Sequence, residues 1–518
     1  MKRNRNKAEK QSRFSFWSIP GALFIFIGTL CLTSALWYIN VYGNVGADAL
    51  VYTLFSDVGN AAPELIYNYI FCALLPALVI SAGVVSFMFA NYRNKIVVSL
   101  GKSKKLSLFP FPKWLSCTVS FVLSGLIVFY SMTVVGLDKY IKNMLSPPIP
   151  FIYDNNVQPQ NVKITFPENK QNLIMIYLES METSFLSEEY EGGSAYNLIP
   201  ELCELAEENI NFSNNETVGG FKALYGATWT VAAMMAINSG LPLKLPPQYQ
   251  VAGADANEFD ADSFAPGATM LPDILHKNGY YQAFMCGSDA SFGSRRQLFT
   301  QHGVDTIYDL ETAVDDGIIP KGYFVWWGME DLYLFRYAKQ ELTKMAKQSQ
   351  PFAFSLLTAD THHVGGYRCR YCRSRYPDQY SNVIACSSRQ VNNFVNWIKK
   401  QDFYENTTIV IMGDHPSMDN DYIKNNITED FDRRVYDCFI NSRVTAGKTK
   451  NREFSSFDMF PTVLAALGCK IEGDRLGLGV NLFSDLPTLC EEYSYEELNS
   501  NLSAKSDFYD TVILRMSD

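Results

Sequence analysis

The sequence has no excess of basic residues. Its 44 Lys and Arg are outnumbered by 54 Asp and Glu, which gives a formal net charge of -10 over 518 residues. Nucleic acids are bound through clustered Lys and Arg that neutralise phosphates, so this balance excludes nucleic acid as an expected partner. Internal repeats and long low-complexity segments are also missing from the sequence.

Charged residues are scarce as well, at 19% against 47% apolar residues, and they are scarcest before residue 140. Three runs there, at about 16–41, 66–90 and 114–137, have no Lys, Arg, Asp or Glu at their centres. Each is long enough to cross a bilayer, which takes about 20 residues. One such run could be a buried core helix, and the first could be a cleaved signal peptide. Three in succession, and the length of the first, favour membrane spans.

Basic residues are missing from the loop between the first two runs. They gather before the first run, at residues 2–13, and after the second run, at residues 93–105. Because Lys and Arg mark the cytoplasmic side of a membrane, we expect the N-terminus inside and everything after about residue 138 outside. The sequence therefore predicts a multi-pass protein of the cytoplasmic membrane. It would have a membrane domain at 1–137, an irregular linker at 138–168 and an extracytoplasmic domain at 169–518.

The outer part of the chain alternates short apolar runs with helical patterns. The runs at 172–178, 281–285, 352–358 and 407–412 have the length of buried strands. Helical patterns lie between and after them, for example at 391–400 and 457–467. This alternation predicts an α/β fold with a mostly parallel sheet covered by helices on both faces. Ligands of such folds bind beyond the carboxyl ends of the strands.

Polar side chains follow each of these runs: Glu179, Asp289, His362 with His363, and Asp414 with His415. Carboxylates beside an imidazole suit a divalent metal such as Mn2+ or Zn2+. Because the ends of neighbouring parallel strands lie close together, we expect Glu179, Asp414 and His415 to form a metal site. The chain has only five His, and we interpret His276 and His302 as structural or exposed residues.

The segment 226–235 (GATWTVAAMM) predicts the start of a helix. Gly226 gives a flexible approach, and Thr228 or Thr230 could cap the exposed N–H groups of the first turn. A hydroxyl at a helix N-terminus beside a metal could instead lose its proton and attack phosphorus. The pattern alone leaves both interpretations open.

Eight of the eleven cysteines lie in the outer part, and three of these are close in sequence: Cys369, Cys372 and Cys386. A Cys-x-x-Cys pair can indicate zinc or a redox site. We find no second such pair and no nearby His at ligand spacing, and an extracytoplasmic compartment permits disulfides. We therefore expect at least two of the three to pair with each other.

In chain order, the stretches LES, GATWT, GSDASFGSRR, LTADTHH, MGDH and FDMFPTVLAALG resemble the phosphoglycerol transferases of the alkaline phosphatase/sulfatase superfamily. The resemblance covers about residues 170–480. In GATWT, TADTHH and CSSRQV it is closer to the glucan phosphoglycerol transferases than to the lipoteichoic acid synthases. It implies a sulfatase-like catalytic domain. One departure is that the family's His-Gly-Asp stretch is replaced by Cys-Gly-Ser-Asp at 286–289.

The resemblance also implies roles for individual residues. Those implied as metal ligands are Glu179, Thr228, Asp414 and His415, with Thr228 also the nucleophile. The implied metal is Mn2+, with Zn2+ and Mg2+ as alternatives. Those implied as substrate contacts are His362, His363, Asp289 and either Arg295 or Arg296, because the adjacent arginines leave the register open by one residue.

The implied activity is transfer of sn-glycerol phosphate from phosphatidylglycerol, through a phospho-threonine intermediate, to a cell-envelope glycan or teichoic-acid-type acceptor. A phosphoethanolamine transferase is the alternative, because it would share the fold, the topology and a nucleophilic threonine. A sulfatase is not expected, because its chemistry needs Cys or Ser in a Cys/Ser-x-Pro-x-Arg stretch, and none occurs at Thr228. A non-enzymatic scaffold would have no use for the implied ligand set.

Overall fold

The computed structural model describes residues 17–43, 46–55, 63–89, 96–100, 104–109, 112–146, 151–244 and 264–515. The chain divides into two compact units, which we call the helical unit (1–40 with 63–139) and the sheet unit (41–62 with 140–518). Each unit is described by itself below.

Long apolar helices make up the helical unit: α1 (Ser18–Tyr42), α4 (Leu75–Phe89), which continues α3 (Pro63–Tyr69) through a π-helical turn, and α5 (Lys113–Val134). Three helices, Ser18–Tyr42, Leu65–Phe89 and Lys113–Val134, are long and apolar enough to cross a membrane. They overlap the three runs predicted from the sequence, as expected of a membrane protein. The basic residues that predict the orientation lie mostly outside the described residues, so the orientation stays a prediction.

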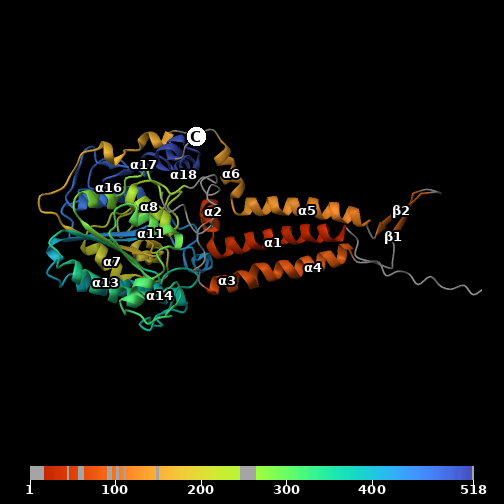
Figure 1. Ribbon diagram of the computed structural model, residues 1–518, viewed down its shortest axis with the longest axis horizontal. Helices are drawn as coiled ribbons and strands as arrows, with labels where there is room; N and C mark the ends of the chain where they lie inside the picture. Colours follow the sequence, from red (N-terminus) through yellow and green to blue (C-terminus); the bar gives the residue numbers. More distant parts are fainter. Residues whose placement is uncertain are drawn as a thin grey trace, which may run out of the picture. The chain divides into compact units, whose positions relative to one another are not determined.

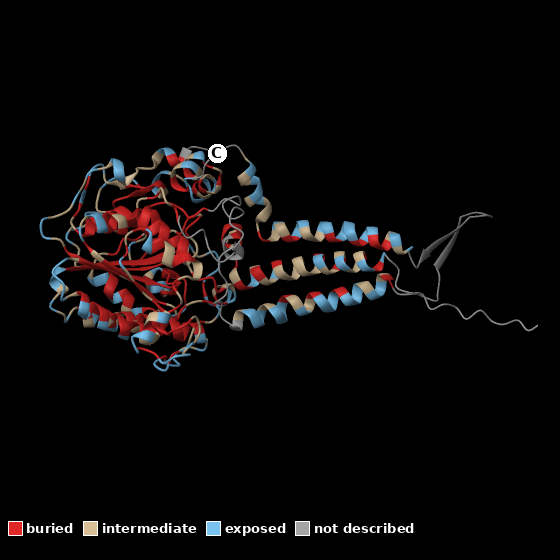
Figure 2. Ribbon diagram, in the orientation of Figure 1, coloured by how far each residue is buried: buried red, intermediate tan, exposed pale blue. Residues whose placement is uncertain are grey.

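Small and hydroxyl-bearing side chains bring these helices together. The Oγ1 atom of Thr29 lies 2.5 Å from the Oγ atom of Ser81, and Ser124 donates a hydrogen bond to the Phe24 carbonyl. Such contacts replace the hydrophobic effect, which gives no drive for helix association in lipid. The outward faces are exposed and apolar, with Phe71 and Phe129 among them, and Figure 2 shows these faces in pale blue. An antiparallel hairpin of β1 (Ile96–Leu100) and β2 (Lys104–Phe109), which the sequence did not predict, separates α4 from α5.

A seven-stranded sheet organises the sheet unit, in the order β5-β10-β9-β4-β8-β6-β7. The strands predicted from the sequence form its centre: β9 (Thr407–Gly413), β4 (Asn172–Leu178), β8 (Phe352–Leu357) and β6 (Tyr281–Cys286). These four and β7 (Thr306–Tyr308) are parallel, whereas β10 (Val435–Ile440) runs antiparallel to β9 and to β5 (Gly220–Phe221). The predicted mostly parallel α/β sheet is confirmed.

Helices cover both faces of this sheet (Figure 1). Along β4, Met175 and Tyr177 join one buried apolar cluster, while Ile174 and Ile176 join the other. The first cluster includes residues of α8 (Thr230–Ser239), α10 (Leu271–Lys277), α11 (Arg295–Thr300), α16 (Met459–Ala466) and α18 (Tyr495–Ser503). The second includes residues of α7 (Pro200–Glu208), α12 (Leu310–Asp315), α13 (Asp331–Met345) and α14 (Gln379–Ile398). Burial on both faces explains why the central strands read as continuous apolar runs.

The segment 138–168 is more regular than the predicted linker. It begins inside helix α6 (Leu137–Leu145) and continues through two 3-10 turns (Phe151–Asn155 and Pro159–Asn161) to β3 (Ile164–Thr165), which pairs with β11 (Lys470–Ile471). Apolar residues recur at helical spacing in α6, at Leu137, Tyr140, Ile141 and Met144. Because prolines follow farther along the segment, the sequence predicted an irregular linker instead of this short helix. The remaining elements are α2 (Ala47–Phe55), α15 (Asn420–Asn426), α17 (Leu489–Glu492), β12 (Arg475–Leu476) and β13 (Gly479–Val480).

Candidate metal centre and active site

Two neighbouring parallel strands end at the same level and deliver the candidate metal ligands. Leu178 of β4 is in register with Gly413 of β9, so Glu179 and Asp414 leave the sheet side by side. The Ser180 N–H donates a hydrogen bond of 2.9 Å to the Oδ1 atom of Asp414, which holds the two strand ends together. A Cβ atom at Gly413 would lie 2.0 Å from the Met181 carbonyl oxygen. Only glycine therefore fits before Asp414.

Glu179, Asp414 and His415 form one buried group, and their candidate ligand atoms lie within 4.8 Å of one another. The Nε2 atom of His415 is 3.6 Å from Glu179 Oε1 and 3.4 Å from Asp414 Oδ2. The Nδ1 atom of His415 is 2.9 Å from the Pro416 carbonyl oxygen, so Nδ1 carries the proton and the lone pair of Nε2, which faces the two carboxylates, is left for a metal ion. Asp414 Oδ2 is buried and accepts no hydrogen bond from any residue that the structure describes. These features fit a divalent metal.

The electrostatics of the group also favour a cation. Burial, and then the charge of Glu179, raises the pKa of Asp414 to about 7. Burial opposes charge on His415, but Asp414 and Glu179 outweigh it and raise the His415 pKa. Burial likewise opposes ionisation of Glu179, yet His362 and His415 lower its pKa overall. Two buried carboxylates are costly without a compensating positive charge, which a bound metal ion provides.

The hydroxyl that reaches this group belongs to Thr230 and not to Thr228. Thr230 Oγ1 lies 3.4 Å from Glu179 Oε2 and 3.4 Å from His415 Nε2. Helix α8 begins at Thr230, and its N-cap is Trp229, whose extended backbone makes no side-chain cap. The predicted capping role therefore fits neither threonine. The Thr228 side chain is half-buried and makes no hydrogen bond within the described part of the chain.

The two adjacent arginines have different surroundings. Arg296 forms an ion pair with the buried Asp309, with 2.5 Å between Nη2 and Oδ2. Arg295 is buried and donates to the Ser288 hydroxyl at 3.0 Å and to the Asp289 carbonyl at 2.8 Å. The positive charge of Arg295 contributes to lowering the pKa of His362, after burial as the largest cause. Arg295 is thus the arginine beside the site, and Arg296 secures the loop before α12.

His362 interacts electrostatically with Glu179 and His415 of the metal group, and His363 interacts with His415. Burial lowers the pKa of His362, although the charge of Glu179 opposes this shift. Burial also lowers the pKa of His363 well below its ordinary value. The Asp289 carboxylate, the remaining predicted contact, accepts a hydrogen bond of 2.8 Å from the Ser291 N–H in a local turn.

Trp327 is a site residue that the sequence did not single out. Its ring centroid lies 4.4 Å from that of His362 and 5.4 Å from that of Phe292. The indole Nε1 of Trp327 is buried and has no hydrogen-bond acceptor among the residues described. A buried N–H without a partner is costly, and a bound ligand can supply the missing acceptor. The Trp-Trp-Gly stretch at 326–328 was the available signal in the sequence.

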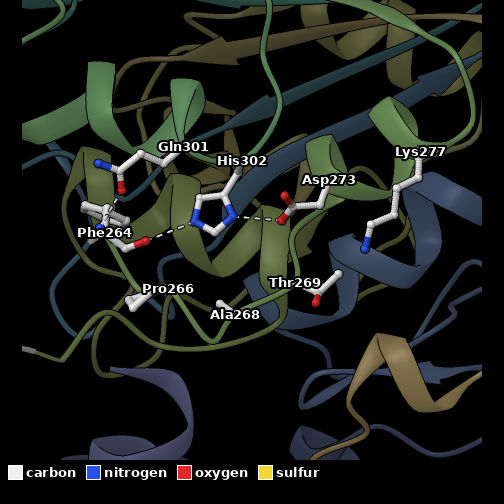
Figure 3. A pocket seen from close by; sticks show the side chains of 8 residues that line it. All are labelled: Phe264, Pro266, Ala268, Thr269, Asp273, Lys277, Gln301 and His302. Carbon is white, nitrogen blue, oxygen red and sulfur yellow. Dashed lines mark hydrogen bonds and ion pairs between the residues drawn. The ribbon is translucent and has the colours of Figure 1, made fainter. Parts of the chain in front are cut away.

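His302 lies in a different part of the sheet unit, as the sequence predicts for a structural histidine. Its Nδ1 atom is 2.7 Å from Asp273 Oδ2, and its Nε2 atom is 3.0 Å from the Phe264 carbonyl oxygen. Figure 3 shows both interactions at the wall of a cavity of about 270 Å³. His276, on α10, lies beside Gly303. Neither histidine belongs to the metal group.

The sheet unit is a mostly parallel α/β domain whose strand ends carry Glu179, Asp414 and His415 beside the N-terminus of α8. Residues 171–469 match the sulfatase family, which is more than half of the chain. The chain belongs to the sulfatase family.

Known proteins similar to this chain include phosphoglycerol transferases. It is 30% identical over 305 residues to phosphoglycerol transferase I of Xanthomonas euvesicatoria, covering 58% of this chain and 41% of the relative. For the enzyme of Salmonella choleraesuis, identity is 30% over 330 residues, covering 62% and 40%. The chain thus spans about two fifths of the length of these relatives.

One solved structure resembles almost the whole chain. It is the integral membrane protein lipooligosaccharide phosphoethanolamine transferase A from Neisseria meningitidis, with a TM-score of 0.51. The alignment covers 94% of this chain and 87% of that protein at 13% identity. At this identity the likeness establishes a shared fold and nothing further.

Proposed function

We propose that this protein is a metal-dependent phosphoglycerol transferase of the cytoplasmic membrane, with its active site on the outer face. It would move sn-glycerol phosphate from phosphatidylglycerol to a cell-envelope glycan or teichoic-acid-type acceptor. The observation that carries the proposal is the Thr230 hydroxyl, 3.4 Å from both Glu179 and His415 at the N-terminus of α8. The similarity to phosphoglycerol transferases I supports the choice of transferred group.

Glu179, Thr230, Asp414 and His415 would hold the metal, with Mn2+ as our first choice and Zn2+ or Mg2+ as alternatives. When bound there, a divalent ion eases deprotonation of a hydroxyl and withdraws charge from a phosphoryl oxygen. We assign the nucleophile to Thr230 in place of Thr228, because the nucleophile must contact the ligand group.

In the first half-reaction, the Thr230 oxygen attacks the phosphorus of phosphatidylglycerol and diacylglycerol leaves. The product on the enzyme is a glycerophospho-threonine. The N–H groups at the N-terminus of α8, which point toward the site, would stabilise the charge on the phosphoryl oxygens. In the second half-reaction an acceptor hydroxyl attacks the same phosphorus and Thr230 is regenerated.

Each half-reaction moves one proton from the attacking hydroxyl to the leaving oxygen. His362 can carry this proton, because burial favours the neutral imidazole and Glu179 lies close enough to stabilise the transient imidazolium. Arg295 would bind a phosphoryl oxygen through its planar guanidinium. The unpaired indole N–H of Trp327 would donate a hydrogen bond to a hydroxyl of the glycerol headgroup.

Release of diacylglycerol tests the proposal. Purified full-length protein would be placed in vesicles with headgroup-labelled phosphatidylglycerol or phosphatidylethanolamine and a glycan acceptor. We expect release from phosphatidylglycerol only, loss of release on chelation and recovery with Mn2+. Release from phosphatidylethanolamine only would assign the alternative activity. No release from either lipid by folded, metal-loaded protein would contradict both.

A further inference from the structure

We infer a second metal site in the sheet unit, formed by Cys369, Cys372 and Cys386 and suited to a thiophilic divalent ion such as Zn2+. It shares no residue with the first group. The inference is independent of the proposed transferase activity.

Distances between the sulfur atoms carry this inference. Cys369 Sγ lies 3.7 Å from Cys372 Sγ and 3.7 Å from Cys386 Sγ, and all three sulfurs lie within 4.8 Å of one another. In a tetrahedral zinc site with Zn–S bonds of about 2.3 Å, sulfur atoms are about 3.8 Å apart. A disulfide would need about 2.05 Å. Two of the three sulfur–sulfur separations therefore match an edge of a metal-centred tetrahedron, and the third is within 4.8 Å.

Local structure holds the three sulfurs in place. Cys369 and Cys372 lie in the loop after β8, where the Cys372 N–H donates to the Cys369 carbonyl at 3.0 Å and closes a tight turn. This two-residue separation is the usual spacing of paired zinc ligands. Cys386 comes from the buried face of α14, and all three side chains are buried. The site is thus assembled by the fold and shielded from solvent.

The number of sulfurs also distinguishes a metal site from the disulfide that the sequence favours. A disulfide would use two of the three cysteines and leave the third sulfur buried against it. Every cysteine in the described residues is free in the structure, and those of the sheet unit outside this cluster are Cys203, Cys286, Cys438, Cys469 and Cys490. The outer location alone therefore does not decide in favour of pairing.

Metal ligation needs the thiolate form of cysteine, so binding would release the thiol protons of the cluster to solvent.

A metal here would tie the loop that carries His362 to helix α14. Cys369 and Cys372 follow His362 in the same loop, and Cys386 belongs to the helix. The site would act as a positioning clamp and not as a second catalytic centre.

Metal content tests the inference. Full-length protein would be purified in detergent with its thiols protected from air, and zinc per chain would be measured. We expect Cys386→Ser and Cys372→Ser to hold about one zinc ion fewer than the wild type. Asp414→Asn should keep this ion, because it alters only the first group. Cys469→Ser, which removes a buried thiol outside the cluster, is the matched control and should match the wild type.

A second readout uses the unaltered chain. Alkylation of Cys369, Cys372 and Cys386 should be slow in the native protein and become at least tenfold faster after chelation. This comparison decides the question even where a serine variant fails to fold. A disulfide among the three in the protected protein, equal zinc in Cys386→Ser and wild type, or alkylation unaffected by the chelator would overturn the inference.

Discussion

Thr228 and Thr230 are two residues apart and behave oppositely under the proposed mechanism. We expect Thr230→Ala to reduce diacylglycerol release at least about 10³-fold while the protein stays folded, because covalent catalysis is lost. Thr230→Ser should keep part of the activity, since a hydroxyl remains. Thr228→Ala is the matched control and should keep most activity, because this side chain makes no hydrogen bond with any described residue.

The rates would be measured on variants whose melting temperatures match the wild type. Wild-type turnover by Thr230→Ala would remove the basis of the mechanism.

Arg295 and Arg296 also separate under substitution. Arg295→Ala should lower kcat/KM for the lipid about 10- to 100-fold, because a phosphate contact is lost. Arg296→Ala should instead lower the free energy of unfolding by about 1–3 kcal/mol, because Asp309 is left buried without its cation. Kinetics and thermal unfolding of both variants check this. Equal kinetic defects in the two variants would contradict it.

Some residues of the site could be predicted from the sequence, and others could not. Glu179, Asp414 and His415 could be placed because buried strands have recognisable ends, and parallel ends meet at one edge of a sheet. The resemblance assigned the nucleophile to Thr228, and the residue pattern alone left Thr228 and Thr230 open, because the choice depends on where α8 begins, and the extended backbone of Trp229 sets that point. Trp327 was missed because its contact with His362 joins two loops far apart in the sequence.

At the scale of elements, continuous apolar runs identified the four central strands, because both faces of the sheet are buried. The short helix α6 and the hairpin β1–β2 were not foreseen, since neither has a long pattern. The hydrogen bonds made by the loops could not be predicted from the sequence either. Asp331 at the start of α13 accepts hydrogen bonds from the Ala359 and Asp360 N–H groups, while Asp360 accepts one from the Asp331 N–H.

These hydrogen bonds between α13 and the loop that carries His362 should make the free energy of unfolding depend on pH. Burial raises the pKa of Asp331 to about 7, above its ordinary value of 3.8. The folded state therefore binds the Asp331 proton more tightly than the unfolded state does. The resulting contribution to the free energy of unfolding is fully present below pH ~4 and is lost as pH rises through ~7. Asn mimics the protonated form of Asp331. As pH rises from 5 to 8, the melting temperature of the wild type should therefore decrease relative to that of Asp331→Asn.

Thermal unfolding across this range measures the difference. Asp402→Asn, at an exposed position after α14, is the control and should show no such trend. A difference that stays constant or grows with pH for Asp331→Asn would show that the carboxyl is already ionised in the folded protein.

At the scale of the whole molecule, apolar helices and a sulfatase-family domain in one chain suit chemistry on a lipid donor. The predicted orientation can be tested directly. Protease added outside intact spheroplasts should release a fragment of ~40 kDa, at ~110 Da per residue after about residue 138, because the basic segments hold the N-terminus inside. Protection of that domain until the membrane is opened would reverse the orientation and exclude an outer-leaflet donor.

The covalent intermediate distinguishes Thr230 from Thr228 most directly. Full-length protein would be incubated with phosphatidylglycerol and metal but no acceptor, digested, and the peptide containing both threonines fragmented by mass spectrometry. We expect a glycerophosphoryl group on Thr230 in the wild type and in Thr228→Ala, and none in Thr230→Ala. A glycerophosphoryl group on Thr228, or an active enzyme that forms no adduct on either threonine, would contradict it.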